Sequence, residues 1–186
     1  MHQSAPPRNQ TDDEAAALSE PGGARTRTYT WDDPAVSAAA ARELDGAAFL
    51  QAILEGSLPA VPIARTLGFR PVSVQPGSVV FEFRPAEFHY NPIGSVHGGV
   101  LSTLCDSSCG CSVQSLLPAG TYYTSLDLSV KFLRAVTSAA GLLTCTGTVT
   151  HLGGRSALAE ARLTGSDGKL YAHATSSCMV FRPAAP

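Results

Sequence analysis

The sequence lacks several features that would define its class at once. No apolar run reaches the roughly 18–20 residues of a membrane helix, and Met1–Pro7 has neither the basic start nor the apolar stretch of a secretory signal peptide. Positive charge is not in excess, because the 186 residues carry 13 Lys and Arg against 15 Asp and Glu, a net charge of −2. Since nucleic-acid-binding domains are usually strongly basic, we expect neither a nucleic-acid partner nor a membrane partner.

Cysteines are few and odd in number. Five are present, at Cys105, Cys109, Cys111, Cys145 and Cys178. An odd count without a secretion signal favours reduced thiols and a cytoplasmic location over a disulfide framework. The spacing C-x3-C-x-C of the first three is not a usual zinc pattern, and no second ligand pair follows it. We therefore expect no metal site and interpret these cysteines as small buried helix residues.

The signature motifs of several common enzyme classes are also missing. The sequence contains no G-x-S-x-G, G-x-G-x-x-G, G-x-x-x-x-G-K-[ST], H-E-x-x-H or C-x-x-C. These motifs belong to common serine hydrolases, nucleotide-binding proteins, zinc proteases and thiol oxidoreductases. Such classes are disfavoured, and no cofactor is expected.

Carboxylates are scarce in the larger part of the chain. Residues 1–45 hold eight of the fifteen, are rich in Ala, Pro and Gly, and show little apolar periodicity. We predict that residues 1–45 form a mostly flexible N-terminal extension and that residues 46–186 form one domain. Within the extension, Tyr29–Pro34 contains the only tryptophan and is the best candidate for docking on the domain.

The domain begins with helical patterns and continues mainly with strands. Apolar periodicity predicts helices over 46–58 and 63–67. Alternating patterns predict strands over 69–74, 79–84, 124–132, 142–150, 156–164 and 169–181. In the strand over 124–132, one face would carry Leu126, Leu128, Val130 and Phe132, and the other Ser125, Asp127, Ser129 and Lys131.

A long helix interrupts these strands. It is predicted over 98–117 and ends before Pro118. Most residues on both of its sides are small or apolar, so we expect it to be enclosed by the sheet. The fold class is therefore α+β, with a central helix wrapped by an antiparallel sheet.

Asp106 is the single carboxylate of this helix. It lies in mid-helix among small residues, where aspartate is a poor helix former. A half-buried carboxylate is costly unless it is paired or has a chemical role. Asp106 is therefore a candidate catalytic residue, with a purely structural carboxylate as the alternative.

The segment Asn91-Pro92-Ile93-Gly94-Ser95-Val96-His97-Gly98-Gly99 leads into the helix. Asn-Pro and glycine favour a tight turn, and the glycine pair permits close approach of another group to the helix start. Backbone N–H groups there lack intrahelical partners and can donate to a developing oxyanion. The alternative is that the glycine pair only relieves crowding in a turn.

Together, the pattern Asn91-x-x-Gly94-x-x-His97-Gly98-Gly99, then Asp106, then Val130-Lys131-Phe132-Leu133-Arg134 resembles the PaaI-type branch of hotdog-fold acyl-CoA thioesterases. The resemblance spans residues 59–181. It implies a hotdog fold, assembly as a homodimer or homotetramer, and an active site between subunits. It also implies hydrolysis of an acyl-CoA thioester to the free acid and CoA, with CoA being part of the substrate.

The resemblance further implies a set of catalytic roles. Asp106 would act as general base on water or as nucleophile, and the Gly98 N–H would polarise the thioester carbonyl. Asn91 would position that carbonyl or the water. His97 would orient the site or take a direct part, and Ser125, with neighbouring Thr124 as the competing choice, would order the water.

CoA brings phosphates, which call for positive charge near the rim of the site. Arg134, Arg155 and Lys131 are the candidates for this contact. The family commonly has proline where this chain has Ala135, which bears on the placement of Arg134. The aromatic stretches Phe88–Tyr90 and Tyr122–Tyr123 are candidates for the pocket wall and suit an aryl or an aliphatic acyl group.

Two other functions remain open at the level of sequence. One is an enoyl thioester hydratase or dehydratase, but His97 followed by two glycines does not resemble the histidine–carboxylate motif of those enzymes. The other is a non-catalytic module that binds acyl-CoA or an aromatic ligand on the same fold. The presence of both Asn91 and Asp106 favours the hydrolase.

Overall fold

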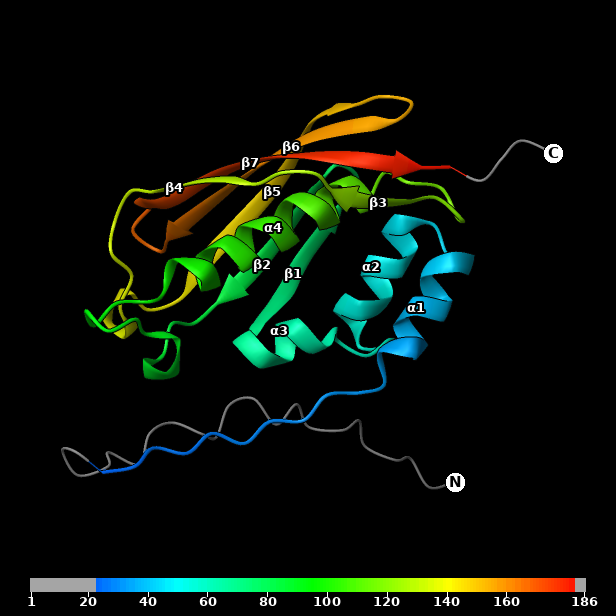
Figure 1. Ribbon diagram of the computed structural model, residues 1–186. Helices are drawn as coiled ribbons and strands as arrows, with labels where there is room; N and C mark the ends of the chain where they lie inside the picture. The colour runs from blue at the N-terminus through cyan, green and yellow to red at the C-terminus, as the bar shows by residue number, and fades with distance from the viewer. Residues whose placement is uncertain (1–22, 183–186) are drawn as a thin grey trace, which may run out of the picture.

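The structure is a computed structural model that describes residues 23–182 (Figure 1). Its elements in chain order are α1 (Pro34–Glu43), α2 (Gly46–Glu55), α3 (Pro62–Leu67), β1 (Phe69–Gln75), β2 (Ser78–Phe83), η1 (Glu87–His89), α4 (Gly98–Gln114), β3 (Tyr122–Ser125), β4 (Ser129–Phe132), η2 (Ser138–Ala140), β5 (Leu143–Leu152), β6 (Ser156–Gly165) and β7 (Leu170–Phe181).

One antiparallel sheet wraps the long helix. Its strand order is β1-β2-β5-β6-β7-β3, and β4 pairs with β7 beside β3. Helix α4 lies against one face of this sheet, and α1, α2 and α3 lie on the same side of the sheet as α4 (Figure 1). The predicted α+β hotdog architecture is confirmed.

Two glycines allow α4 to lie unusually close to its neighbours. A Cβ on Gly110 of α4 would lie 2.0 Å from the Tyr123 hydroxyl, and one on Gly147 of β5 would lie 2.0 Å from the carbonyl oxygen of Ser108. Neither position has room for a larger side chain. The backbone of α4 is therefore in direct contact with β5, which fixes the position of Asp106 relative to the sheet.

The cysteines belong to this packed interior. Cys105, Cys109, Cys145 and Cys178 are buried, and all five thiols are free. Burial raises the pKa of Cys109 to about 12, so this group stays protonated at neutral pH. Among residues 23–182, no group of three or more His, Cys, Asp or Glu side chains could hold a metal ion. No helix in the same range combines the length and apolar character needed to cross a bilayer.

The strand predicted over 124–132 is in fact two strands. Ser125 pairs with Cys178 and Ser129 with Thr175, so four steps along this segment oppose three along β7. One extra residue of this kind is a β-bulge, and it reverses the alternation of side chains. The prediction that Ser125 and Phe132 face opposite sides was therefore wrong, because both side chains contact α4.

Asp127 ties the bulge to β7. Its carboxylate accepts hydrogen bonds from the Ser177 N–H at 3.1 Å and from the Ser177 hydroxyl. Its carbonyl accepts from the Ser176 hydroxyl at 2.8 Å, and the Leu126 N–H donates to the Ser177 carbonyl at 2.8 Å. The bonds from Ser177 lower the pKa of Asp127 below its usual value.

The N-terminal part of the chain contains a helix that apolar periodicity does not reveal. Helix α1 begins after Asp33, whose side chain caps it by accepting from the Ala35 N–H at 2.9 Å, and Pro34 occupies the first turn. This Asp-Pro start is a recognisable helix signal. In the Tyr29–Pro34 segment Trp31 is 60% exposed, and the docking contacts come from Arg25 and Arg27 instead. The rest of the predicted extension, residues 1–22, lies outside the described residues.

Candidate active site

The start of α4 leaves one backbone donor free. His97 precedes the helix, and its Nδ1 accepts from the Gly99 N–H at 2.9 Å while its carbonyl accepts from the Val100 N–H at 2.9 Å. The N–H of His97 itself donates to the His89 carbonyl at 2.8 Å. Among residues 23–182, the Gly98 N–H has no acceptor. His97 thus caps the helix, and Gly98 offers the donor.

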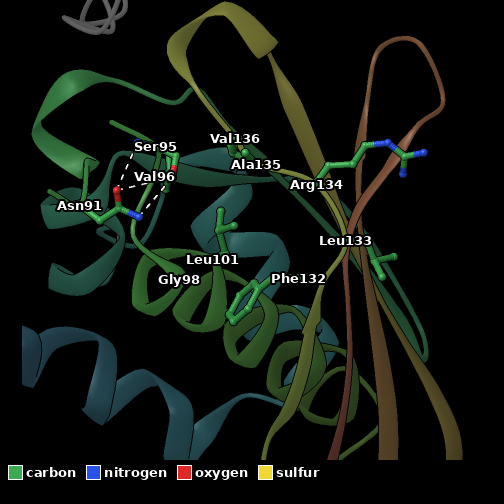
Figure 2. Close-up of a pocket in the computed structure, with 10 residues that line it drawn as sticks. All are labelled: Asn91, Ser95, Val96, Gly98, Leu101, Phe132, Leu133, Arg134, Ala135 and Val136. Carbon is green, nitrogen blue, oxygen red and sulfur yellow. Dashed lines mark hydrogen bonds between the residues drawn. The ribbon is translucent and has the colours of Figure 1, made fainter. Parts of the chain in front are cut away.

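Gly98 opens into a cavity of about 310 Å³, which we call the first cavity. Its lining residues are Asn91, Ser95, Val96, Gly98, Leu101, Phe132, Leu133, Arg134, Ala135 and Val136 (Figure 2). A Cβ on Gly98 would lie 3.0 Å from the Phe132 ring. Any larger residue at position 98 would therefore make a tight contact with this ring and would push it away from the helix start.

Asn91 is held within its own loop. Its Oδ1 accepts from the N–H groups of Ile93 at 3.1 Å and Ser95 at 3.2 Å, and its Nδ2 donates to the Ser95 hydroxyl at 3.1 Å (Figure 2). Such an Asx arrangement fixes the carboxamide. One N–H of the amide is then left to donate to a group in the first cavity.

The three predicted cations are not together. Arg134 lines the first cavity, and its side chain extends away from Asn91 to donate to the Leu170 carbonyl at 2.6 Å (Figure 2). Lys131 neighbours Phe132 on β4, so its side chain points to the opposite face of the sheet.

Arg155 lies at the far end of the sheet from Arg134. The Arg134 N–H donates to the Tyr171 carbonyl, and the Arg155 carbonyl accepts from the Val180 N–H. Tyr171 and Val180 are nine residues apart on β7, which corresponds to about 30 Å. Arg134 and Arg155 of one chain therefore cannot share a single phosphate group.

Asp106 and Ser125 form a separate pair. The Ser125 hydroxyl donates to Asp106 Oδ1 at 2.9 Å, and Asp106 is half-buried. Thr124 precedes Ser125 in β3, so its side chain points to the other face. Asp106 follows Gly98 by eight residues, which places it about 12 Å further along the helix axis and about 80° around it. Asp106 and Ser125 line neither cavity.

A larger cavity of about 540 Å³, which we call the second cavity, lies between α3, η1 and α4. Its lining residues are Arg27, Ile63, Thr66, Leu67, Phe88, His89, Tyr90, His97, Gly99, Val100 and Thr103. The predicted aromatic stretch Phe88–Tyr90 lines it. Tyr122 instead stacks on Phe181, and Tyr123 is packed against Gly110.

His97 faces the second cavity, whereas Asn91 and Gly98 face the first. The sequence motif thus divides between two cavities on either side of the helix start. The contribution of Arg27 to the second cavity was missed at the level of sequence, because nothing in the local pattern connects residue 27 with residues 65 and 66.

Comparisons with known proteins define the family. Residues 93–172 match the sequence model of the thioesterase superfamily. A phenylacetic acid degradation-related protein from Ralstonia eutropha is 30% identical, with a TM-score of 0.64 over 70% of this chain and 98% of that one. The PaaI protein of Escherichia coli has the same fold, with 22% identity, a TM-score of 0.64, and coverage of 75% of this chain and 96% of that one.

Curated relatives match over shorter stretches. The 1,4-dihydroxy-2-naphthoyl-CoA hydrolase of Listeria monocytogenes is 26% identical over 108 residues, 58% of this chain and 86% of that protein. Human acyl-coenzyme A thioesterase 13 is 32% identical over 87 residues, 45% of this chain and 60% of that protein. The chain belongs to the thioesterase superfamily and is a thioester hydrolase of the PaaI-type hotdog branch.

Proposed function

We propose that the chain hydrolyses an acyl-CoA thioester at a site completed by two copies of the chain. The observation that carries this proposal is the separation of the two chemical groups within one chain. The free Gly98 N–H and the Asp106 carboxylate lie about 12 Å apart along α4. A carbonyl polarised by one and attacked with the help of the other needs both within a few ångströms. A second chain can supply the missing partner.

Each group has a defined part in the reaction. Asp106, oriented by the Ser125 hydroxyl at 2.9 Å, takes a proton from the attacking water, whose oxygen bonds to the thioester carbon. The Gly98 N–H, with Asn91 beside it, donates to the oxyanion that forms. The C–S bond then breaks, and the CoA thiolate leaves with little need for a general acid. If Asp106 attacks directly, the intermediate is an anhydride, which water then hydrolyses.

The apolar edge formed by β3 and β4 supports assembly with a second copy. Leu126 is 58% exposed and Phe132 is 52% exposed, and Leu133 and Tyr122 are also exposed along this edge. Such a row of apolar side chains beside unpaired strand edges is costly in water. We therefore propose a homodimer as the smallest active unit, with two equivalent sites related by a two-fold axis, and a homotetramer as a larger assembly of the same unit.

The CoA phosphates are assigned to the rim of the first cavity. Arg134 is the best-supported contact, since it lines that cavity and is an exposed residue. Lys131 and Arg155 line neither cavity, so any part they take requires the second chain. No cofactor is assigned, because each step uses water and the residues named above.

The catalytic role is tested by Asp106→Asn. Release of free thiol from a panel of aryl- and fatty acyl-CoA thioesters should fall about 10²–10⁴-fold, the usual contribution of a general base. Asp167→Asn, in the exposed turn between β6 and β7, is the matched control and should keep full activity. Full activity of Asp106→Asn would refute the role, and acyl-CoA binding without thiol release by the wild type would favour the non-catalytic module.

The two-chain site is tested by mixing inactive variants. Asp106→Asn and Asn91→Ala chains, each inactive alone, are unfolded together and refolded. A mixed dimer then contains one intact site, so an equal mixture should recover about a quarter of the wild-type rate. No recovery from a mixture that forms dimers would show that both residues act within one chain.

A further inference from the structure

Residues 23–33, which we call the N-terminal strap, are fastened to the domain at two points. Arg25 forms an ion pair with Glu87 of η1 at 2.5 Å. The Arg27 guanidinium donates to the carbonyls of Thr66 at 2.5 Å and Arg65 at 3.1 Å, in the last turn of α3. Figure 1 shows the strap in blue, passing on the far side of α3 from the sheet.

The same guanidinium also packs on aromatic rings. It lies 4.0 Å from the centre of the Phe88 ring and 4.8 Å from that of Tyr29. An arginine that stacks on aromatic faces and donates to fixed carbonyls is held in place by several interactions at once. Arg27 is therefore a fixed part of the wall of the second cavity.

The second cavity reaches close to Asp106. Gly99 and Thr103 of α4 line the cavity. Thr103 follows Gly99 by four residues and Asp106 follows Thr103 by three, so all three lie on one face of the helix. Thr103 is one turn before Asp106, about 4.5 Å along the axis. An acyl group whose carbonyl lies at Asp106 can thus extend past Thr103 into the second cavity.

The rest of the lining suits an apolar acyl group. Ile63, Leu67 and Val100 supply aliphatic surface, and Phe88 and Tyr90 supply rings. These residues come from α3, from η1 and the residue after it, and from the first turn of α4, and the strap adds Arg27. An acyl group that passes Thr103 therefore enters a cavity whose wall includes the stacked pair of Arg27 and Phe88.

We propose that the second cavity holds the acyl group of the thioester and that Arg27, stacked on Phe88, is the wall that limits the length of that group. This inference rests on the proposed function. The family match covers residues 93–172, so Arg27, Ile63 and Phe88 all lie outside it. Arg27 also lies outside residues 59–181, over which the chain resembles the family, so the resemblance does not supply this wall.

The test compares two substitutions of Arg27. In Arg27→Ala the wall is removed, whereas Arg27→Met keeps a long side chain against Phe88 and loses the charge and the hydrogen bonds to the Thr66 and Arg65 carbonyls. The kcat/KM of each variant is measured with straight-chain acyl-CoA thioesters from acetyl to dodecanoyl and with benzoyl-, phenylacetyl- and naphthoyl-CoA. Arg27→Ala should raise the ratio of longer to shorter substrates about tenfold or more, and Arg27→Met should leave it near the wild-type value.

Two further variants distinguish a residue that forms the cavity wall from a residue that only anchors the strap. Arg25→Ala removes the other anchor of the strap but lines no part of the cavity, so it should not change the ratio. Phe88→Ala removes the partner of Arg27 in the wall and should shift the ratio in the same direction as Arg27→Ala. Melting temperatures of all four variants show whether each chain is folded.

The outcomes distinguish this inference from the proposed function. If Arg27→Ala leaves the length profile unchanged, or lowers kcat/KM equally for every substrate, Arg27 is not a length-limiting wall, while hydrolysis by the wild type still supports the proposed function. If the wild type cleaves none of the thioesters, the proposed function fails and this inference fails with it.

Discussion

His89 is a buried titratable residue that several neighbours hold in place. It is 3% exposed and lies between the rings of Phe83 and Phe88, at centroid distances of 4.8 and 4.1 Å. The Ala86 N–H donates to its Nδ1 at 3.0 Å, so Nε2 carries the proton and donates to the Leu67 carbonyl at 2.9 Å. Protonation would place a second N–H against that of Ala86. Burial, aided by the nearby charge of Arg27, lowers the pKa of His89 below 6.5.

This lowered pKa makes the free energy of unfolding depend on pH. Below about pH 6.5 the unfolded chain takes up a proton at His89 that the folded chain refuses, so stability falls as pH drops toward the folded-state pKa. The slope from this group reaches at most about 1.4 kcal/mol per pH unit. His89→Asn keeps an acceptor near the Ala86 N–H and should flatten the urea-unfolding profile between pH 5 and 7. His151→Asn, at an exposed position of β5, should keep the wild-type slope.

At the scale of single elements, the local patterns in the sequence predicted most helices and strands close to their observed positions. The helix predicted over 98–117 is α4, and five of the six predicted strands lie within two residues of their observed ends. The exception is 124–132, where alternation continues through the bulge and gives no sign of it. The extra residue is specified by contacts of Asp127 with Ser176 and Ser177, about 50 positions away. Local periodicity cannot report such a contact.

The bulge has a consequence for the catalytic pair, and Asp127→Ala tests it. Without the carboxylate, the bulge loses its two bonds from Ser177, and Ser125 is no longer directed reliably toward Asp106. We expect kcat to fall about 10–100-fold with a smaller change in KM, as for a misplaced catalytic group. Asp167→Ala, which removes a carboxylate paired with Lys169 in an exposed turn, should leave kcat unchanged. Equal kcat values in both variants would show that the bulge has no part in positioning the catalytic pair.

The contact between α4 and β5 provides a test of packing. In Gly147→Ala the new methyl group would lie 2.0 Å from the Ser108 carbonyl, and backbone on both sides must move to accept it. We expect a loss of about 1–3 kcal/mol in the free energy of unfolding, measured by urea titration. Gly154→Ala, which meets nothing within 4 Å, should unfold like the wild type. A wild-type value for Gly147→Ala would mean that α4 and β5 are further apart than described.

At the scale of the whole molecule, the predicted site residues that line the first cavity are separate from the Asp106–Ser125 pair, and His97 faces the second cavity. Asp106 and Ser125 form one set, and Asn91, Gly98 and Arg134 form the other. A linear motif names both sets but does not say that they lie on different faces of α4, because that depends on the helix geometry from Gly98 to Asp106. Nor could it supply Arg27, whose partners are 38 and 39 residues away.

Assembly is tested at the β3–β4 edge. Leu126 is exposed and lines neither cavity, so Leu126→Glu changes the edge without altering cavity walls. We expect a charge there to shift the protein from dimer to monomer in analytical ultracentrifugation and to lower the rate per chain in parallel. Val36→Glu, an exposed apolar position on α1, should change neither. A fully active monomer would overturn the two-chain site.

The attachment of Arg27 to the end of α3 bears on where the protein can be cut. A shortened protein for expression would naturally begin near Gly46, since the regular apolar pattern starts at that residue. Removing the segment before Gly46 would expose the two carbonyls that Arg27 covers and would take away one side of the second cavity. A shortened protein could keep its catalytic pair and still report the wrong substrate preference, so specificity should be measured on a chain that retains Arg27.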